Sequence, residues 1–210
     1  MKQLELRIIS GSLRGRKLKL PQDPDLRPMA DRVRAALFSI LGNAVPDRPF
    51  LDVFAGSGAV GVEALSRGAK QAIFVEKDAS RVRDLLKHLK MFGVDDRAQV
   101  IQADAFRWVD KGAIPNEPVN LFLGPPYADF ERHRGELTTL MEGIRLKIVA
   151  DSVFIVQSET ELPTDLLPDP ENWDLRRYGR SQLAIWVKPR PELAQVQTGI
   201  TEQHSENDAS

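Results

Sequence analysis

One stretch decides the fold of this chain: Leu51-Asp52-Val53-Phe54-Ala55-Gly56-Ser57-Gly58-Ala59-Val60-Gly61. An apolar run ends in an aspartate, a loop of small residues follows, and a helix-compatible segment then runs from Ala59 to Arg67. This pattern predicts a strand, a tight turn and the N-terminus of a helix. Glycines let a ligand lie against bare backbone, where the N–H groups of a helix end point at it. The loop therefore indicates a site for a nucleotide-like cofactor.

Strands and helices alternate on the C-terminal side of this loop. The predicted strands are 50–54, 72–76, 99–102, 119–123 and 153–157, and the predicted helices are 59–67, 80–92 and 135–149. Repeated βα units imply a parallel sheet with helices on both faces. Segments 175–178 and 181–187 flank a Gly-Arg turn, which predicts a closing antiparallel hairpin. We expect a Rossmann-like α/β fold with a mostly parallel, seven-stranded sheet.

The N-terminal part predicts a small arm and one helix. Segments 6–9 and 17–20 look like strands with Gly11 and Gly15 between them, so we expect a protruding β-hairpin. Asp31 is expected to cap a helix that runs to Leu41. The predicted organisation is a basic arm over residues 1–25, a main domain over residues 26–188 and a disordered acidic tail over residues 189–210.

Composition excludes several classes of site. The 210 residues include no cysteine, so disulfides and thiolate metal or redox sites are excluded. With no His/Asp cluster at ligand spacing we expect no metal, and with no long apolar run we expect a cytoplasmic protein without membrane contact. We also expect a monomer. Residues 1–34 carry nine Lys or Arg and four Asp or Glu. This excess suggests a local polyanion contact, although charge alone favours ordinary solvation of a hairpin.

The loop leaves two kinds of cofactor open. It contains a literal G-x-G-x-x-G from Gly56 to Gly61, which by itself is weak evidence for a dinucleotide. The arm and the helix that precede the first strand of the sheet argue against a dinucleotide, because a dinucleotide-binding motif often opens its domain. Glu76 ends the next strand and can accept from two vicinal ribose hydroxyls in either cofactor. Glu76 therefore does not separate the two interpretations.

Asp-x-Phe-Ala-Gly-Ser-Gly resembles the first motif of class I S-adenosylmethionine-dependent methyltransferases. The resemblance implies that the loop wraps the methionine part of this cofactor and that acidic residues after the next two strands hold its ribose and adenine. The implied cofactor-binding residues are Asp52, Phe54, Ala55, Gly56, Ser57, Gly58, Glu76, Lys77, Asp104 and Ala105. Asp104 has an alternative role as the N-cap of a short helix, and its two oxygens can serve both roles.

Asn120-Leu121-Phe122-Leu123-Gly124-Pro125-Pro126-Tyr127 resembles the catalytic turn of amino methyltransferases, which has Asp, Asn or Ser before Pro-Pro and an aromatic residue. The lone pair of an exocyclic amine is delocalised into the base. Two acceptors aimed at its hydrogens favour the nucleophilic form, and an aromatic stack is worth about 1–3 kcal/mol. Gly124 supplies no side-chain acceptor, and such a loss costs on the order of 3 kcal/mol by analogy with oxyanion holes. The alternative is that this segment is only a rigid turn.

Segments 7–16, 26–38 and 52–69 together resemble the RsmD-type family of small-subunit ribosomal RNA guanine-N2 methyltransferases, from which Gly124 departs because the family has Asp there. The resemblance implies methylation of a guanine in 16S ribosomal RNA, with Gly124, Pro125, Pro126 and Tyr127 at the reaction site. The predicted RNA-binding residues are Arg14, Arg16, Lys17, Lys19 and Arg32. Two alternatives stand beside this one: a catalytically impaired RNA- or ribosome-binding protein, and an NAD-dependent oxidoreductase.

Overall fold

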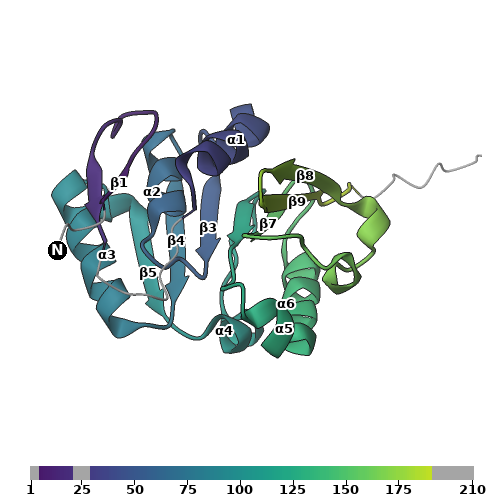
Figure 1. The fold of residues 1–210 in the computed structure, drawn as a ribbon. Helices are drawn as coiled ribbons and strands as arrows, with labels where there is room; N and C mark the ends of the chain where they lie inside the picture. Colours follow the sequence, from purple (N-terminus) through teal and green to yellow (C-terminus); the bar gives the residue numbers. More distant parts are fainter. Residues whose placement is uncertain (1–4, 21–28, 191–210) are drawn as a thin grey trace, which may run out of the picture.

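A seven-stranded mixed sheet forms the centre of the computed structural model, which describes residues 5–20 and 29–190 (Figure 1). The strand order is β5-β4-β3-β6-β7-β9-β8, in which the first five strands pair in parallel and β9 pairs antiparallel with both β7 and β8. The predicted fold is confirmed. The strands are β3 (Pro49–Val53), β4 (Gln71–Glu76), β5 (Ala98–Gln102), β6 (Asn120–Leu123), β7 (Val153–Ser158), β8 (Asp174–Tyr178) and β9 (Ser181–Val187).

Helices cover both faces of this sheet. Apolar residues of α1, α2 and α3 pack on one face, and those of α4, α5 and α6 pack on the other. The helices are α1 (Asp31–Leu41), α2 (Ala59–Ser66), α3 (Ala79–Phe92), α4 (Ala105–Lys111), α5 (Asp129–Arg132) and α6 (Arg134–Lys147). No helix in the described ranges is long and apolar enough to cross a membrane. The predicted tail, apart from 189–190, and the predicted domain boundary at residue 25 lie outside those ranges.

The strand order reverses direction at β3. The chain runs from β3 to β4 and β5 on one side, then crosses to β6 and β7 on the other. Open sheets bind ligands at the carboxyl ends of the strands beside such a reversal. The loops after β3 and β6 are the two segments that the sequence singles out, and the fold places them at this point.

Helix α2 begins at the cofactor loop and is held there by a buried carboxylate. Its N-cap, Gly58, has no side chain, but Asp52 Oδ2 on β3 accepts from the Gly61 N–H at 2.8 Å. This bond satisfies one of the free donors of a helix N-terminus. A Cβ atom on Gly61 would lie 2.2 Å from the Phe74 ring, so glycine allows the helix to approach β4 this closely. Burial raises the pKa of Asp52 to about 7, although the Gly61 bond opposes that rise.

The N-terminal hairpin is formed by β1 (Glu5–Arg7) and β2 (Lys17–Lys19), as predicted, but it does not protrude. Ile8, Leu13 and Leu18 are at most 6% exposed and pack in one cluster with residues of α2 and α3. Figure 1 shows the hairpin at the end of the sheet away from β8 and β9. The expectation of a projecting arm was wrong, because apolar residues recur along the arm and pack against apolar residues of these helices.

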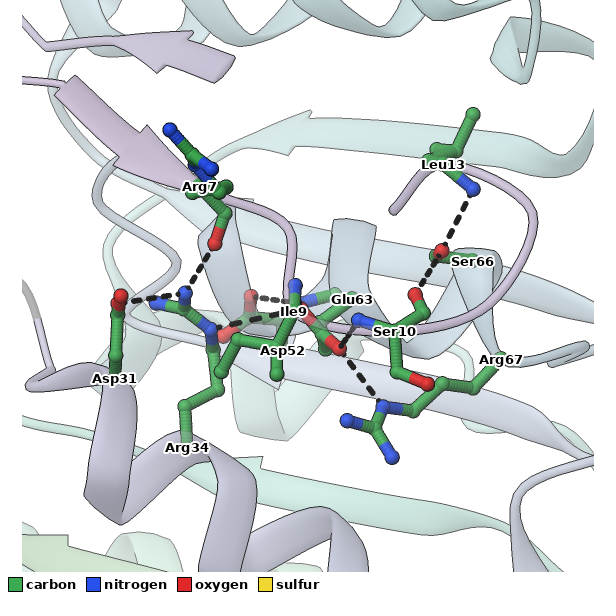
Figure 2. A network of polar contacts seen from close by, with 11 residues as sticks. Arg7, Ile9, Ser10, Leu13, Asp31, Arg34, Asp52, Glu63, Ser66 and Arg67 are labelled. Atoms are coloured by element: carbon green, nitrogen blue, oxygen red, sulfur yellow. Dashed lines mark hydrogen bonds and ion pairs between the residues drawn. The ribbon is translucent and has the colours of Figure 1, made fainter. Parts of the chain in front are cut away.

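A single carboxylate, that of Glu63 in α2, ties the arm to the helix (Figure 2). Its oxygens accept from the backbone N–H groups of Ile9 at 2.7 Å and Ser10 at 3.0 Å. Arg67 Nε lies 2.8 Å and Arg34 Nε 3.7 Å from the same carboxylate. Glu63 and Arg34 are both fully buried. A buried charge is costly unless it is paired and hydrogen-bonded, and both conditions hold for the Glu63 carboxylate. Arg34 is paired as well, but its Nε and Nη1 atoms have no hydrogen-bond partner in the described part of the chain.

One turn further along α2, Ser66 makes a second attachment. Its carbonyl oxygen accepts from the Ser12 N–H at 2.8 Å, and its hydroxyl accepts from the Leu13 N–H at 2.9 Å. Gly11 has a φ of +81°, and a Cβ atom there would lie 1.8 Å from the Ser66 carbonyl oxygen. The arm therefore lies on the helix backbone at a distance that only glycine permits.

Asp31 does not cap α1, contrary to the prediction. The N-cap is Ala30, which makes no side-chain cap, and Asp31 is the first helical residue. Its carboxylate accepts instead from Arg34 Nη2 at 2.9 Å. The same nitrogen donates to the carbonyl oxygen of Arg7 at 2.6 Å. The strong cation one turn away competes successfully with the helix-end N–H groups, and it joins α1 to the arm.

We expect Glu63→Gln to lower the free energy of unfolding by about 3–5 kcal/mol, because the fully buried Arg34 would keep only the exposed carboxylate of Asp31 as a counter-charge. Denaturant unfolding of the full chain measures this loss. The matched control is Glu117→Gln, whose partner Lys70 lies 2.7 Å away in an exposed pair. That substitution should cost less than about 1 kcal/mol. Equal losses for the two variants would contradict the role given to Glu63.

We expect Asp52→Asn to remove a pH-dependent part of the stability. The folded-state pKa is raised from 3.8 to about 7, so the stability contributed by this group is complete below the lower value and is lost as the pH rises to the upper one. The amide oxygen of Asn can still accept from Gly61. Unfolding midpoints of wild type and variant should coincide near the lower pKa. Above the upper pKa the variant should be more stable by on the order of 2–4 kcal/mol, and a constant difference would contradict this assignment.

Candidate functional site

The carboxyl ends of β3, β4, β5 and β6 bring together the predicted cofactor and reaction residues. Glu76 is the last residue of β4, and Asp104 and Gly124 follow β5 and β6 closely. The Gly124 N–H donates to the Val53 carbonyl oxygen at 3.2 Å, which joins the Pro-Pro turn to the end of β3. Two loops far apart in the sequence thus form one site.

The glycine-rich loop uses its own N–H groups internally. Gly56 N–H donates to Glu76 Oε2 at 2.8 Å, and Gly58 N–H donates to the Ala55 carbonyl oxygen at 2.7 Å. The third glycine of the motif donates to the buried carboxylate on β3 described above. A dinucleotide site needs free N–H groups for a pyrophosphate, and here carboxylates occupy two of the three. The loop therefore fits a cofactor without phosphate, such as S-adenosylmethionine.

Glu76 is held rigidly at the predicted ribose position. It is 5% exposed, its Oε1 atom accepts from the Asp78 N–H at 2.8 Å, and Arg81 Nη1 lies 3.8 Å from the same oxygen. A carboxylate offers about four acceptor sites, so two hydroxyls can still bind it. The next residue, Lys77, is exposed. Glu76 fits the vicinal hydroxyls of a ribose.

Asp104 caps α4, and one of its oxygens remains available. Asp104 Oδ1 accepts from the Phe106 N–H at 3.0 Å, while Oδ2 makes no hydrogen bond with any described residue. The capping alternative is therefore correct, and it leaves the second oxygen for an exocyclic amine. Ala105, the first residue of α4, is buried beneath the site.

The predicted residue Phe54 stands beside the loop with two rings that were not predicted as site residues, those of Phe106 and His133. Phe54 has a φ of +64°, which is strained for a bulky residue. Its ring packs edge-on against Phe106 with centroids 5.5 Å apart, and the His133 ring lies 5.5 Å beyond Phe106. The aromatic character of position 106, directly after the start of the capped helix, was the only available signal. The flat adenine of the cofactor fits such an apolar wall.

Asp129 is another site-edge residue absent from the predicted set, because α5 was not predicted. Burial raises the pKa of its carboxyl group, whereas the nearby His133 and Lys77 lower it. The carboxylate of Asp104 acts in the same direction as burial. The side chains of Asp104, Asp129, Lys77 and His133 thus lie together at this edge of the site. No group of His, Asp or Glu side chains in the described ranges could hold a metal ion.

The Pro-Pro turn has a glycine for a packing reason. A Cβ atom on Gly124 would lie 2.8 Å from the ring of Phe122, which is 3% exposed. Pro125 is buried and Pro126 exposed, and Tyr127 is 42% exposed. The aromatic side chain is accessible for stacking, but position 124 offers no side-chain acceptor.

The predicted RNA-binding residues fall into two groups. Arg14 and Arg32 line one cavity of about 440 Å³ between the arm and α1, together with Arg7, Ile8, Ile9, Gly15, Asp31 and Ala35. Arg7 was missed because alternation marked it only as a strand residue. Three arginines thus line this cavity, and the guanidinium group of Arg32 also packs against Gly179 between β8 and β9.

The other three cations lie toward α3. Arg16 stands over the Phe92 ring at 5.9 Å, and Lys17 pairs with Glu5 at 2.7 Å. Lys19 lines a cavity of about 10 Å³ shared with Gly56 and Ser57. The end of the arm therefore borders the cofactor loop, which no feature of the sequence indicated.

Known proteins share this fold and much of this sequence. A family model described as conserved hypothetical protein 95 matches residues 6–187. Ribosomal RNA small subunit methyltransferase D of Escherichia coli K12 is 38% identical over 175 residues, which cover 82% of this chain and 83% of that protein. The structure of a hypothetical protein of Thermus thermophilus matches with a TM-score of 0.69 and 34% identity, over 87% of this chain and 99% of the other.

A more distant match extends the likeness of fold. An RNA methyltransferase of Salinibacter ruber, solved with S-adenosyl-L-homocysteine, is 18% identical with a TM-score of 0.57, over 79% of this chain and 97% of the other. The class I methyltransferase fold is thus shared beyond close relatives. The model match and the identity to the Escherichia coli protein show that the chain belongs to the RsmD family of S-adenosylmethionine-dependent methyltransferases.

Proposed function

We propose that this chain transfers a methyl group from S-adenosylmethionine to the exocyclic N2 amine of a guanine in 16S ribosomal RNA. The observation that carries the proposal is the junction of the two loops, in which the Pro-Pro turn is bonded to the end of β3 beside the cofactor loop. Relatives named as small-subunit ribosomal RNA methyltransferases support the substrate class. We further propose that the chain acts as a monomer in the cytoplasm.

The site residues have distinct roles in this proposal. Glu76 would hold the ribose hydroxyls and Asp104 Oδ2 would accept from the adenine amine of the cofactor, which when bound supplies the methyl group for transfer. Tyr127 stacks on the guanine, and Pro125 and Pro126 fix a backbone carbonyl that accepts from the amine. Orientation of this kind is a large part of a methyl-transfer rate, because it replaces a bimolecular encounter.

The arginine-lined cavity is the proposed RNA contact. Arg7 and Arg14 belong to the arm and Arg32 to α1, and Arg34 and Asp31 tie these elements together. Cations in a preset arrangement bind phosphates at a low cost in conformational entropy. The cavity therefore supports recognition of an RNA backbone near the target base.

A specific observation favours a second candidate, a catalytically impaired RNA- or ribosome-binding protein. Gly124 lacks the acceptor that the family's Asp supplies, and the Phe122 ring occupies the space beside it. The cofactor half of the site is complete in either case. The two candidates therefore differ in turnover and not in cofactor binding.

We expect the full chain to transfer label from tritiated S-adenosylmethionine to small subunits that lack this methylation. Digestion of the product should yield N2-methylguanine, and calorimetry should show binding of S-adenosylmethionine but not of NAD. Cofactor binding without transfer, to subunits or to free 16S RNA, would favour the binding protein. Binding of NAD alone would favour the oxidoreductase.

We expect Arg14→Ala combined with Arg32→Ala to weaken binding of 16S RNA, because the cavity would hold fewer cations for the phosphates. The slope of log K against log salt should fall by about one for each phosphate that the variant no longer neutralises. Filter binding at several salt concentrations measures both quantities. Lys87→Ala with Lys90→Ala removes the same charge from α3 and serves as the control. If both double variants weaken binding equally, net charge and not the cavity determines affinity.

A further inference from the structure

The turn after β6 needs a side-chain acceptor that residue 124 does not have. Parallel pairing sets Leu123 opposite Val156, so the next residues along these strands are Gly124 and Gln157. Leu123 and Val156 face α4 and α6, whereas Gly124 and Gln157 alternate to the other face, on the side of Phe122 and Ile155. Two neighbouring positions at the carboxyl edge therefore face the same side.

The Gln157 side chain reaches the place where an acceptor is missing. Its Oε1 atom lies 3.7 Å from the position that a Cβ atom on Gly124 would take. An aspartate at 124 would carry its oxygens two bonds beyond that Cβ, so the Gln157 oxygen lies somewhat farther from the Cβ position than such a carboxylate oxygen would. The neighbouring β7 strand thus brings an oxygen to the turn.

The Gln157 amide has no hydrogen-bond partner in the described part of the chain, and its atoms are not among the buried unpaired polar atoms of that part, so a substrate can reach them. It is 9% exposed, and neither of its amide atoms bonds to a described residue. The adjacent polar side chains differ: Gln182 Oε1 accepts from the Leu162 N–H at 2.8 Å, and Ser158 Oγ accepts from the Thr160 N–H at 3.3 Å. The Gln157 amide is therefore free to bind a group that enters the site, whereas the neighbouring polar side chains are already bonded within the fold.

We propose that Gln157 Oε1 accepts a hydrogen bond from the guanine N2 amine in place of a side chain at 124, a role that rests on the function proposed above. The amine lone pair forms the N–C bond as the bond from the methyl carbon to sulfur breaks, and the bonding electrons remain on sulfur. The positive charge passes to N2, which then loses one proton to water. Gln157 accepts a hydrogen bond throughout and does not take the proton.

An amide acceptor makes this site different from one with a carboxylate. Hydrogen bonds to a charged acceptor are about twice as strong as neutral ones. The amide does not titrate, so the rate of transfer in the wild-type chain carries no pH dependence from this acceptor. A carboxylate in the same place would add one. This difference separates a group that acts on the amine from one that only packs beside it.

The test uses single-turnover transfer to undermethylated small subunits with the full chain. We expect Gln157→Leu to lower the rate on the order of 10²-fold. Calorimetry should show the same affinity for S-adenosylmethionine as for the wild type, and the unfolding midpoint should equal that of the control variant. Gln71→Leu, on a half-buried glutamine at the opposite end of β4, is the matched control and should keep the wild-type rate.

Gln157→Glu should retain activity and make the rate rise with pH as the new carboxyl group ionises. If the wild-type chain is active and the Gln157→Leu variant is equally active, the role of Gln157 is overturned and the proposed function still stands. A wild-type chain that binds the cofactor and transfers nothing overturns both this inference and the proposed function. A flat pH profile for active Gln157→Glu would also count against contact with the amine.

Discussion

The carboxylate of Glu63 is the constraint on which the rest of this structure depends. It has no exposure to solvent, so its charge must be balanced by groups that the fold brings to it. Two backbone N–H groups of the arm and the guanidinium groups of Arg34 and Arg67 meet this demand. Removal of any of these elements would leave the charge buried and underpaired. The arm is therefore part of the fold and not an appended extension.

Helix α2 links this constraint to the cofactor site. The arm is attached to its second half through Glu63 and Ser66, and the glycine-rich loop leads into its first residue. Asp52 and the close contact of Gly61 with Phe74 fix the helix on the sheet between these two ends. Cations on the arm are thus held at a constant position relative to the cofactor loop. A rigid arrangement of RNA contact and methyl donor lowers the entropy cost of forming the reactive complex.

The sequence was sufficient for the sheet and for the cofactor side of the site. Strand and helix periodicities depend on local alternation, so the seven strands and the loop at residues 51–61 were predicted. The docking of the arm was not, because the partners of Ile8, Leu13 and Leu18 lie on α2 and α3, far away in the sequence. Asp31 was misassigned for the same reason: its competitor, the Arg34 side chain, is held by the carbonyl oxygen of Arg7 and by Glu63. Long-range contacts decided each of these cases.

Contacts between distant segments also matter at Gly124. The residue types within one turn do not describe a reaction site completely, because a neighbouring strand can supply a group to it. An acceptor acts through the position of its oxygen and not through the position of its Cα atom. Adjacent parallel strands end side by side, so an oxygen can reach one point from either strand. The ring of Phe122 fills the space that a side chain at 124 would need, and the amide oxygen on β7 lies 3.7 Å from the position of that side chain's Cβ atom. A departure from the family pattern at one strand end is therefore to be judged together with its neighbour in the sheet.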